Sequence, residues 1–310
     1  MAALLLLLCA CGGEETSSAG ADGASLAPVP AGLRAGCPPP ETPLRYPGGD
    51  LPVGAVAVRL CPGEPTIAYT GDLTGPPIEA PADELTSGAD AMVELVNGLP
   101  DFDPDTPCHM DDGPHHVYWF RYPDGDARAV AYDEAGCHTA VVGDHVQRQN
   151  GDELATAFAD ALLAQRAATN PPRADDKPLA CPMPPRSEPT SVLPAVPLTL
   201  TAATWCVGVG PYRMRSTTIP DDLLERLNSD LLDTPAEGRD RCEMAPYSAT
   251  LEGVTVWGDR VSFLVPGCRV VARTGFGRDN MSTEYEADPQ LLAAIQALPL
   301  GPAQRWQSED

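Results

Sequence analysis

The residues of this sequence that can do the most chemistry are its ten cysteines. Two lie near the start, at Cys9 and Cys11, and the other eight are Cys37, Cys61, Cys108, Cys137, Cys181, Cys206, Cys242 and Cys268. Thiols in an oxidising compartment pair as disulfides, whereas structural zinc sites usually contain closely spaced CxxC pairs. Because the sequence has no CxxC pair, we expect the eight cysteines to form a disulfide framework outside the cytoplasm, and we expect no metal site.

The histidines offer little for catalysis. All of them lie between residues 109 and 145, and the adjacent His115 and His116 favour a hairpin strand over a metal pair, because neighbours on a strand point to opposite faces. The motifs GxSxG, HExxH, GxxxxGK[ST] and GxGxxG, which mark hydrolase, metallopeptidase and nucleotide sites, are absent. We therefore expect no catalytic residues and no cofactor.

An acidic run, Asp101-Phe-Asp103-Pro-Asp105, alternates carboxylates as a calcium loop does. Such side chains can converge on a hard cation. Thr106 stands where the calcium loop needs glycine, and Pro104 stiffens the backbone. We therefore expect a solvated acidic loop here.

The charge of the chain excludes one class of partner. Lys and Arg number 20 against 44 Asp and Glu, a net charge of −24, so the protein repels nucleic-acid phosphates. Residues 37–170 hold 6 basic and 22 acidic side chains, a net charge of −16, whereas residues 171–310 hold 13 and 19, a net charge of −6. A basic partner would be steered toward the first half.

The spacing of the eight later cysteines repeats along the chain. The last four follow the first four at offsets of 144, 145, 134 and 131 residues, and each set begins with a Cys-Pro pair, at Cys37 and Cys181. Two copies of one unit explain this near-constant shift. We therefore predict a first module over residues 37–170 and a second over residues 171–310.

The elements that position these cysteines recur in the same order in both halves. Alternation and helical spacing predict a strand at 53–61, a helix at 85–99, strands at 115–122, 128–132 and 139–142, and a helix beginning near 154. They also predict a strand at 197–206, a helix from 219, strands at 249–257, 260–265 and 269–274, and a last helix capped at 288. The predicted fold class is α+β, with two tandem duplicated modules, each a small antiparallel sheet built as strand, helix, three strands and helix.

Hairpin geometry selects a disulfide pairing for these modules. Cys108 precedes the first strand of a predicted hairpin and Cys137 follows the second, so antiparallel pairing brings the two close together. The duplication then predicts the equivalent pair in the second module. The full scheme is Cys108–Cys137, Cys242–Cys268, Cys37–Cys61 and Cys181–Cys206. Each module is thus expected to be braced by two disulfides.

Residues 4–13 read LLLLLCACGG and contain Leu8-Cys9-Ala10-Cys11. This segment resembles the signal of bacterial lipoproteins. The resemblance implies that residues 1–10 are removed, that the thiol of Cys11 is lipidated, and that residues 11–36 tether the modules to the outer face of the membrane. Buried acyl chains contribute about 0.8 kcal/mol per CH₂, so a short peptide is a sufficient anchor. Without lipidation the chain would be secreted.

Residues 242–268, CEMAPYSATLEGVTVWGDRVSFLVPGC, resemble part of the subtilisin inhibitor-like family of secreted bacterial proteinase inhibitors. The resemblance implies that Met244 is presented to a protease, with Ala245 after it, in a disulfide-braced loop ahead of a hairpin. Met110 and Asp111 repeat the pattern in the first module.

Three hypotheses for function follow from these observations. The first is a lipid-anchored extracytoplasmic protein that binds or senses an unknown protein or envelope ligand without catalysis. The second is a membrane-tethered serine protease inhibitor. An enzyme that uses the carboxylates of the acidic module is the third, and no paired catalytic motif supports it.

Overall fold

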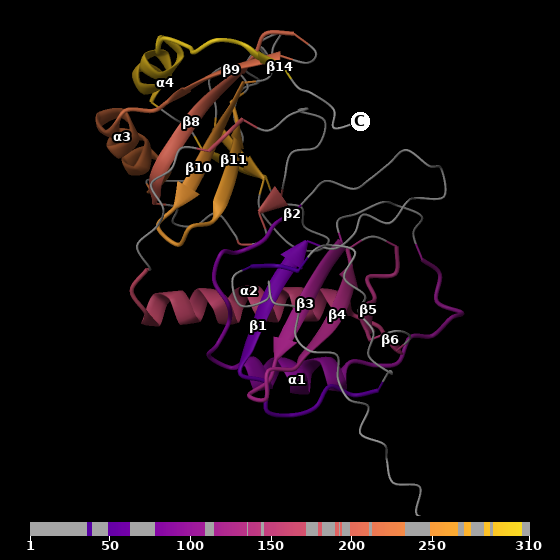
Figure 1. Ribbon diagram of the computed structural model, residues 1–310. Helices are drawn as coiled ribbons and strands as arrows, with labels where there is room; N and C mark the ends of the chain where they lie inside the picture. Colours follow the sequence, from indigo (N-terminus) through magenta and orange to yellow (C-terminus); the bar gives the residue numbers. More distant parts are fainter. Residues whose placement is uncertain are drawn as a thin grey trace, which may run out of the picture.

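The computed structural model describes residues 36–38, 49–62, 78–108, 115–134, 136–143, 146–171, 179–181, 190–191, 193, 199–210, 213–232, 249–265, 270–273, 282–285 and 288–305. These residues form two antiparallel sheets, four α-helices and a short two-stranded pair, arranged as two lobes one above the other (Figure 1). The architecture is α+β, as predicted. Within the described part of the chain, no helix has both the length and the hydropathy needed to cross a lipid bilayer.

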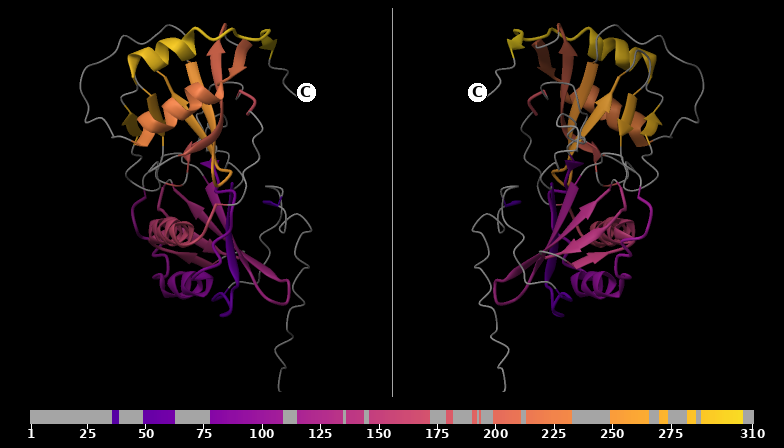
Figure 2. Two further views of the ribbon diagram at one scale, coloured as in Figure 1. Left: turned by 90° about the vertical axis from the view of Figure 1, so that its left-hand side faces the viewer. Right: turned by 90° about the vertical axis from the view of Figure 1, so that its right-hand side faces the viewer.

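The first sheet has five strands in the order β1-β3-β4-β5-β6. Its strands and helices are β1 (Ala57–Pro62), α1 (Ala89–Gly98), β3 (His115–Arg121), β4 (Ala127–Asp133), β5 (Ala140–Val142), β6 (Val146–Arg148) and α2 (Gly151–Ala168). Each neighbouring pair of strands is antiparallel. Both helices lie on one side of this sheet (Figure 2).

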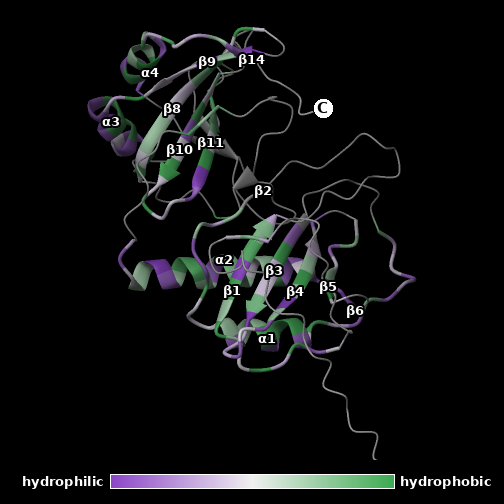
Figure 3. Cartoon of the chain, viewed as in Figure 1, coloured by the Kyte–Doolittle hydropathy of each residue, from purple (hydrophilic) through white to green (hydrophobic). Residues whose placement is uncertain are grey.

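Alternation along β3 determines what each face of the first sheet buries. Tyr118 and Phe120 belong to the main core, where the Tyr118 ring packs edge-on against Phe158 of α2. Val117 and Trp119 point the other way and form a smaller buried cluster that includes Cys61. Strand β1 consists mostly of hydrophobic residues. Helix α2 alternates hydrophobic and hydrophilic residues, as an amphipathic helix does (Figure 3).

The second sheet has seven strands in the order β13-β12-β11-β10-β8-β9-β14. Its strands and helices are β8 (Leu200–Gly208), β9 (Arg213–Thr218), α3 (Asp221–Leu232), β10 (Ala249–Thr255), β11 (Arg260–Leu264), β12 (Val270–Arg273), β13 (Ser282–Tyr285), α4 (Pro289–Gln296) and β14 (Gln304–Arg305). Its core combines Trp205 and Phe263 with apolar side chains of both helices, among them Leu227 and Ile295. Asp288 caps α4 as predicted, because its side chain accepts a hydrogen bond from the backbone N–H of Gln290.

The two sheets share an order of strands. The order β1-β3-β4-β5-β6 corresponds element by element to β8-β10-β11-β12-β13. Along the chain of each lobe, one helix comes between the first two strands of this order, and another comes after the last strand. The second sheet has β9 and β14 in addition, on the far side of β8.

The predicted unit of strand, helix, three strands and helix is wrong in its number of strands. A fifth strand follows in each lobe, β6 and β13, and the sequence pattern predicts neither β9 nor β14. These strands are short or polar: β6 has 3 residues, β14 has 2, and Met214 is the only buried side chain of β9. Alternation cannot be recognised over so few apolar positions. The strand conformation of these segments therefore depends on pairing with a neighbouring strand.

In each lobe an asparagine of the first helix binds the backbone of a leucine that lies earlier in the chain, before β1 in the first lobe and at the start of β8 in the second. Asn97 of α1 accepts a hydrogen bond from the Leu51 N–H at 2.7 Å and donates one to the Leu51 carbonyl at 2.9 Å. Asn228 of α3 does the same with Leu200, at 2.8 and 2.9 Å. One amide side chain thus satisfies both backbone groups of a leucine in each lobe.

Candidate functional site

The candidate site lies where the two lobes meet. The short strand β2 (Ile78–Glu79), which precedes α1, pairs in parallel with β7 (Thr190–Ser191) from the second half of the chain. Leu193, just after β7, is buried in the core of the first sheet. The chain therefore returns to the first lobe before it enters the second.

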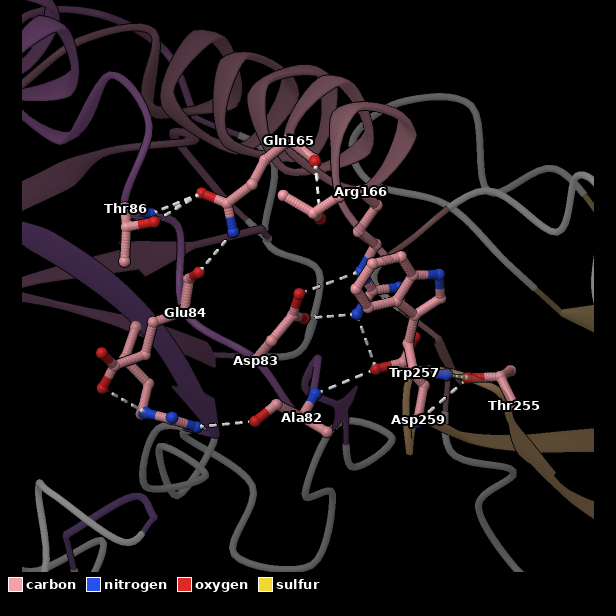
Figure 4. Close-up of polar contacts among 11 residues, drawn as sticks. Ala82, Asp83, Glu84, Thr86, Gln165, Arg166, Thr255, Trp257 and Asp259 are labelled. Atoms are coloured by element: carbon pink, nitrogen blue, oxygen red, sulfur yellow. Dashed lines mark hydrogen bonds and ion pairs between the residues drawn. The ribbon is translucent and has the colours of Figure 1, made fainter. Parts of the chain in front are cut away.

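Arg166, in the last turn of α2, stands at the centre of this junction (Figure 4). Its Nε and Nη2 atoms donate to the two carboxylate oxygens of Asp83 at 3.2 and 2.5 Å. Its Nη1 and Nη2 atoms donate to the two oxygens of Asp259 at 2.6 and 2.9 Å. The Arg166 side chain is only 8% exposed. One guanidinium group thus joins a carboxylate of the first lobe to a carboxylate of the second.

The turn between β10 and β11 holds Asp259 in place. The Thr255 hydroxyl accepts hydrogen bonds from the backbone N–H groups of Trp257 and Asp259 at 3.2 and 3.1 Å. The Trp257 ring covers the guanidinium group, with its centroid 5.1 Å from the Arg166 Cζ atom. This arrangement is a cation–π contact, which is stronger where the cation is removed from water.

Ala82 brings the backbone of the first lobe directly against this turn. Its N–H donates to Asp259 Oδ1 at 2.9 Å. Gly258 has a φ of +86°, and a Cβ atom at that position would lie 3.3 Å from the Ala82 Cβ. A glycine therefore suits the turn both for its backbone conformation and for the close approach of Ala82.

Gln165, next to Arg166 on α2, holds the segment that carries Asp83. Its Oε1 atom accepts from the Thr86 N–H, the Thr86 hydroxyl and the Ser87 N–H at 2.7, 3.0 and 2.8 Å. Its Nε2 atom donates to the Glu84 carbonyl at 2.7 Å. The backbone around Asp83 is therefore held to the same helix that supplies the arginine.

Glu84 extends this network into the first sheet. Its carboxylate accepts from Arg59 Nε at 3.0 Å and pairs with Arg121, while Arg59 Nη1 donates to the Ala82 carbonyl at 3.1 Å. Arg59 and Arg121 come from the paired strands β1 and β3. Two strands and one helix of the first lobe thus present Asp83 to the second lobe.

Burial and charge act in opposite directions on the Arg166 guanidinium. Burial by itself lowers the pKa of Arg166, but hydrogen bonds and charges from Asp259 and Asp83 outweigh it, so the pKa is raised above its ordinary value. The group is a permanent cation whose donors are directed at two carboxylates. Such an arrangement holds elements together and does not provide an exchangeable proton.

Six of the predicted disulfide cysteines lie in the described residues, and they pair as the sequence predicts. The Cα–Cα separations are 5.5 Å for Cys37–Cys61, 4.7 Å for Cys108–Cys137 and 5.8 Å for Cys181–Cys206. Cys242 and Cys268 lie outside the described residues. All three spacings fall within the range that a disulfide bridges.

The other predicted site residues also lie outside the described part of the chain. These are Cys11, Met110, Asp111, Met244 and Ala245. The hairpin that the resemblance to inhibitors places after Met244 is formed by β10 and β11.

The predicted acidic loop is exposed. Asp101, Asp103 and Asp105 are all exposed, Asp101 pairs with Arg148 at 2.5 Å, and Asp103 accepts from the Asp105 N–H. Within the described residues no group of three or more His, Cys, Asp or Glu side chains gathers as a metal site would.

His116 has a buried partner that the sequence did not indicate. Its ring is 1% exposed, its Nε2 atom lies 3.0 Å from Glu134 Oε2, and it packs 5.5 Å from the ring of Tyr132. It lies on β3, the first strand of the hairpin, as the adjacent histidines predict.

Sequence reasoning missed the junction itself, although α2 carries a signal for it. Arg166 comes four residues after the buried Leu162, so it continues the apolar face of the helix. A cation on such a face needs a buried partner. The partner, Asp259, is 93 residues away, in the turn between β10 and β11.

Comparison of the chain with protein-family models, with curated proteins and with solved structures finds no match.

Proposed function

We propose that the chain is an extracytoplasmic protein, anchored to the membrane through Cys11, that works by binding a partner with its two lobes held as one body. The observation that carries this proposal is the junction, where Arg166 is shared by Asp83 and Asp259. A fixed arrangement of two lobes reduces the conformational entropy that is lost when one partner contacts both. The disulfides support the expected oxidising compartment.

The test compares two arginine variants of the full chain, purified with their bound components from the envelope in detergent. Arg166→Gln removes the shared cation of the junction. Arg226→Gln is the matched control, because Arg226 makes an exposed ion pair with Asp288 at 3.0 Å. We expect the wild type and Arg226→Gln to retain the same envelope component and Arg166→Gln to lose it. Circular dichroism must show that both variants are folded, and full retention by a folded Arg166→Gln would contradict the proposal.

The lipid anchor has its own test. Cells that express the full chain are given a radiolabelled fatty acid, and the protein is recovered by precipitation. The wild type should carry label and Cys11→Ser should not, because the thiol of Cys11 is the proposed attachment site. A wild-type chain without label would overturn the anchor.

We also propose that the two lobes descend from one duplicated unit. The shared order of strands and the matching contacts of Asn97 and Asn228 support this proposal. It requires Cys242 to pair with Cys268, as Cys108 pairs with Cys137. Peptide mapping without reduction should find that pair, and a bond from Cys37 to any cysteine beyond Cys137 would contradict the scheme.

A second candidate function is tethered inhibition of a serine protease, favoured by the β10–β11 hairpin, which follows Met244 in the sequence. Equimolar subtilisin added to the full chain should then lose activity and leave a single cut after Met244 or Met110. Simple digestion of the chain, or unchanged protease activity, would reject inhibition and leave the first candidate standing.

A further inference from the structure

A cleft of about 410 Å³ opens at the end of the first sheet, between the loop that precedes β1 and the turn that joins β3 to β4. Pro52 and Val53 line it from the loop, and Tyr122, Asp124, Asp126 and Arg128 line it from the hairpin. None of these residues takes part in the junction described above. The cleft combines an apolar wall with a charged one, which is typical of sites that orient a bound group.

The loop wall is held at three points. Asn97 bonds both backbone groups of Leu51, and the Tyr122 hydroxyl donates to the Pro52 carbonyl at 2.8 Å. The Gly54 N–H donates to Asp90 Oδ1 at 2.5 Å. Helix α1 and Tyr122, the residue after β3, thus keep this loop in one conformation.

The hairpin wall is a tight turn. The Tyr122 N–H donates to the Asp126 carbonyl at 2.9 Å, and the Gly125 N–H donates to the Tyr122 carbonyl at 3.1 Å. Asp124 Oδ1 accepts from the Asp126 N–H at 3.0 Å, and Gly125 takes the positive φ of +93° that the turn needs. Both walls are therefore formed before any ligand arrives, which lowers the entropy cost of binding.

The apolar part of the cleft is exposed to an unusual degree. Val53 is 75% exposed and Val56, three residues later, is 44% exposed. Among the described residues Val209 is the only other large apolar side chain with comparable exposure. The most exposed of these three side chains, Val53, thus lines the cleft.

The charges of the cleft favour a cation. Arg128 is buried, at 5% exposure, and its Nη2 atom lies 3.9 Å from Asp126 Oδ2. Asp124 is exposed at the rim, so two carboxylates and one guanidinium leave a net negative charge. The net charge of −16 over residues 37–170 would steer a basic partner to the same lobe.

We propose that this cleft binds a basic segment of a partner polypeptide, with a lysine or arginine side chain beside Asp124 and an apolar neighbour against Val53. The carboxylate supplies the charge complement, and the exposed valine supplies apolar surface that binding removes from water. This inference rests on the proposed function in one respect, namely that the protein acts by binding.

The probe is the acetylated and amidated pentapeptide ALKLA, carrying a fluorophore, whose anisotropy is followed as the full chain is added in detergent. Matched peptides ALQLA and ALELA replace the cation with a neutral and an acidic residue. We expect ALKLA to bind more tightly than ALQLA and ALELA to bind least. Added salt should weaken ALKLA binding, because exposed charges are screened.

Two variants of the cleft are compared with two matched controls. Asp124→Asn removes the charge but keeps an oxygen that can accept from the Asp126 N–H, and it should weaken ALKLA binding about two- to fivefold. Its control is Asp103→Asn, because Asp103 is an exposed acceptor for the N–H two residues on. Val53→Ser should weaken binding about tenfold, and Val209→Ser is its exposed apolar control.

The outcomes separate this inference from the proposed function. Equal binding of ALKLA and ALELA, or no difference between the cleft variants and their controls, overturns the cleft as a cation site. If the wild type retains an envelope component through an intact junction but fails to bind ALKLA, the cleft is overturned and the proposed function stands.

Discussion

At the scale of single residues, Tyr118 carries a polar hydroxyl that is buried because its ring packs in the core. It is fully buried in the first core, and its hydroxyl has no hydrogen-bond partner among the described residues. A buried hydroxyl without a partner loses its hydration and gains nothing in return. Its ring, in contrast, contributes the edge-on contact with Phe158.

Tyr118→Phe should therefore leave the free energy of unfolding unchanged or raise it by about 1 kcal/mol at neutral pH, as measured by urea unfolding. Tyr122→Phe is the matched control, since the Tyr122 hydroxyl donates to the Pro52 carbonyl. The free energy of unfolding of Tyr122→Phe should be lower than that of the wild type by about 1 kcal/mol. A larger loss for Tyr118→Phe than for Tyr122→Phe would contradict the assignment.

Tyr118 also predicts a loss of stability in alkali. Burial, with the nearby Tyr132 and Glu134, raises the pKa of Tyr118 well above its ordinary value. Above pH 10, near the ordinary tyrosine pKa, the unfolded chain releases a proton that the folded chain retains, so stability falls as the pH rises. Between pH 8 and pH 11 the free energy of unfolding, measured by urea unfolding, should fall less steeply in Tyr118→Phe than in the wild type, by about 1.4 kcal/mol over the whole range. Identical slopes would refute this account.

At the scale of elements, the sequence pattern predicted the helices and the strands that are rich in apolar residues, and it failed for β6, β9 and β14, which are not. The continuous apolar run of β3 and the spacing of Leu154, Phe158 and Leu162 in α2 are recognisable because each covers several apolar positions. β6 and β9 offer too few apolar side chains to show a period. Their conformation depends on the strands β5 and β8 that pair with them.

The two asparagine contacts give a prediction at this scale. Asn97→Ala and Asn228→Ala should each lower the free energy of unfolding by about 1 to 3 kcal/mol, because both the N–H and the carbonyl of a leucine lose their partner. Differential scanning calorimetry measures the effect. Asn170→Ala serves as a control, since Asn170 is exposed just after the end of α2. Losses no larger than the control would show that the contacts do not fix the helices.

At the scale of the whole molecule, we expect the junction to make the two lobes unfold together. Asp259→Ala removes both hydrogen bonds to Arg166 and the acceptor of the Ala82 N–H. It should therefore lower the free energy of unfolding by about 3 kcal/mol. We expect one calorimetric transition for the wild type and two for the variant. Arg226→Gln, on an exposed pair, should cost at most about 1 kcal/mol and keep a single transition. A single transition in Asp259→Ala would show that other contacts couple the lobes.

The sequence by itself determined the α+β class, the long strands and helices, and three disulfides of the described residues. Each of these follows from local periodicity or from spacing along the chain, and short-range physics is enough to predict them. Only the tertiary structure decided the junction and the cleft. Arg166 and Asp259 are 93 residues apart, and the cleft joins a loop before β1 to a turn after β3. No local pattern encodes such pairs, because their contacts exist only once both sheets and their helices have packed.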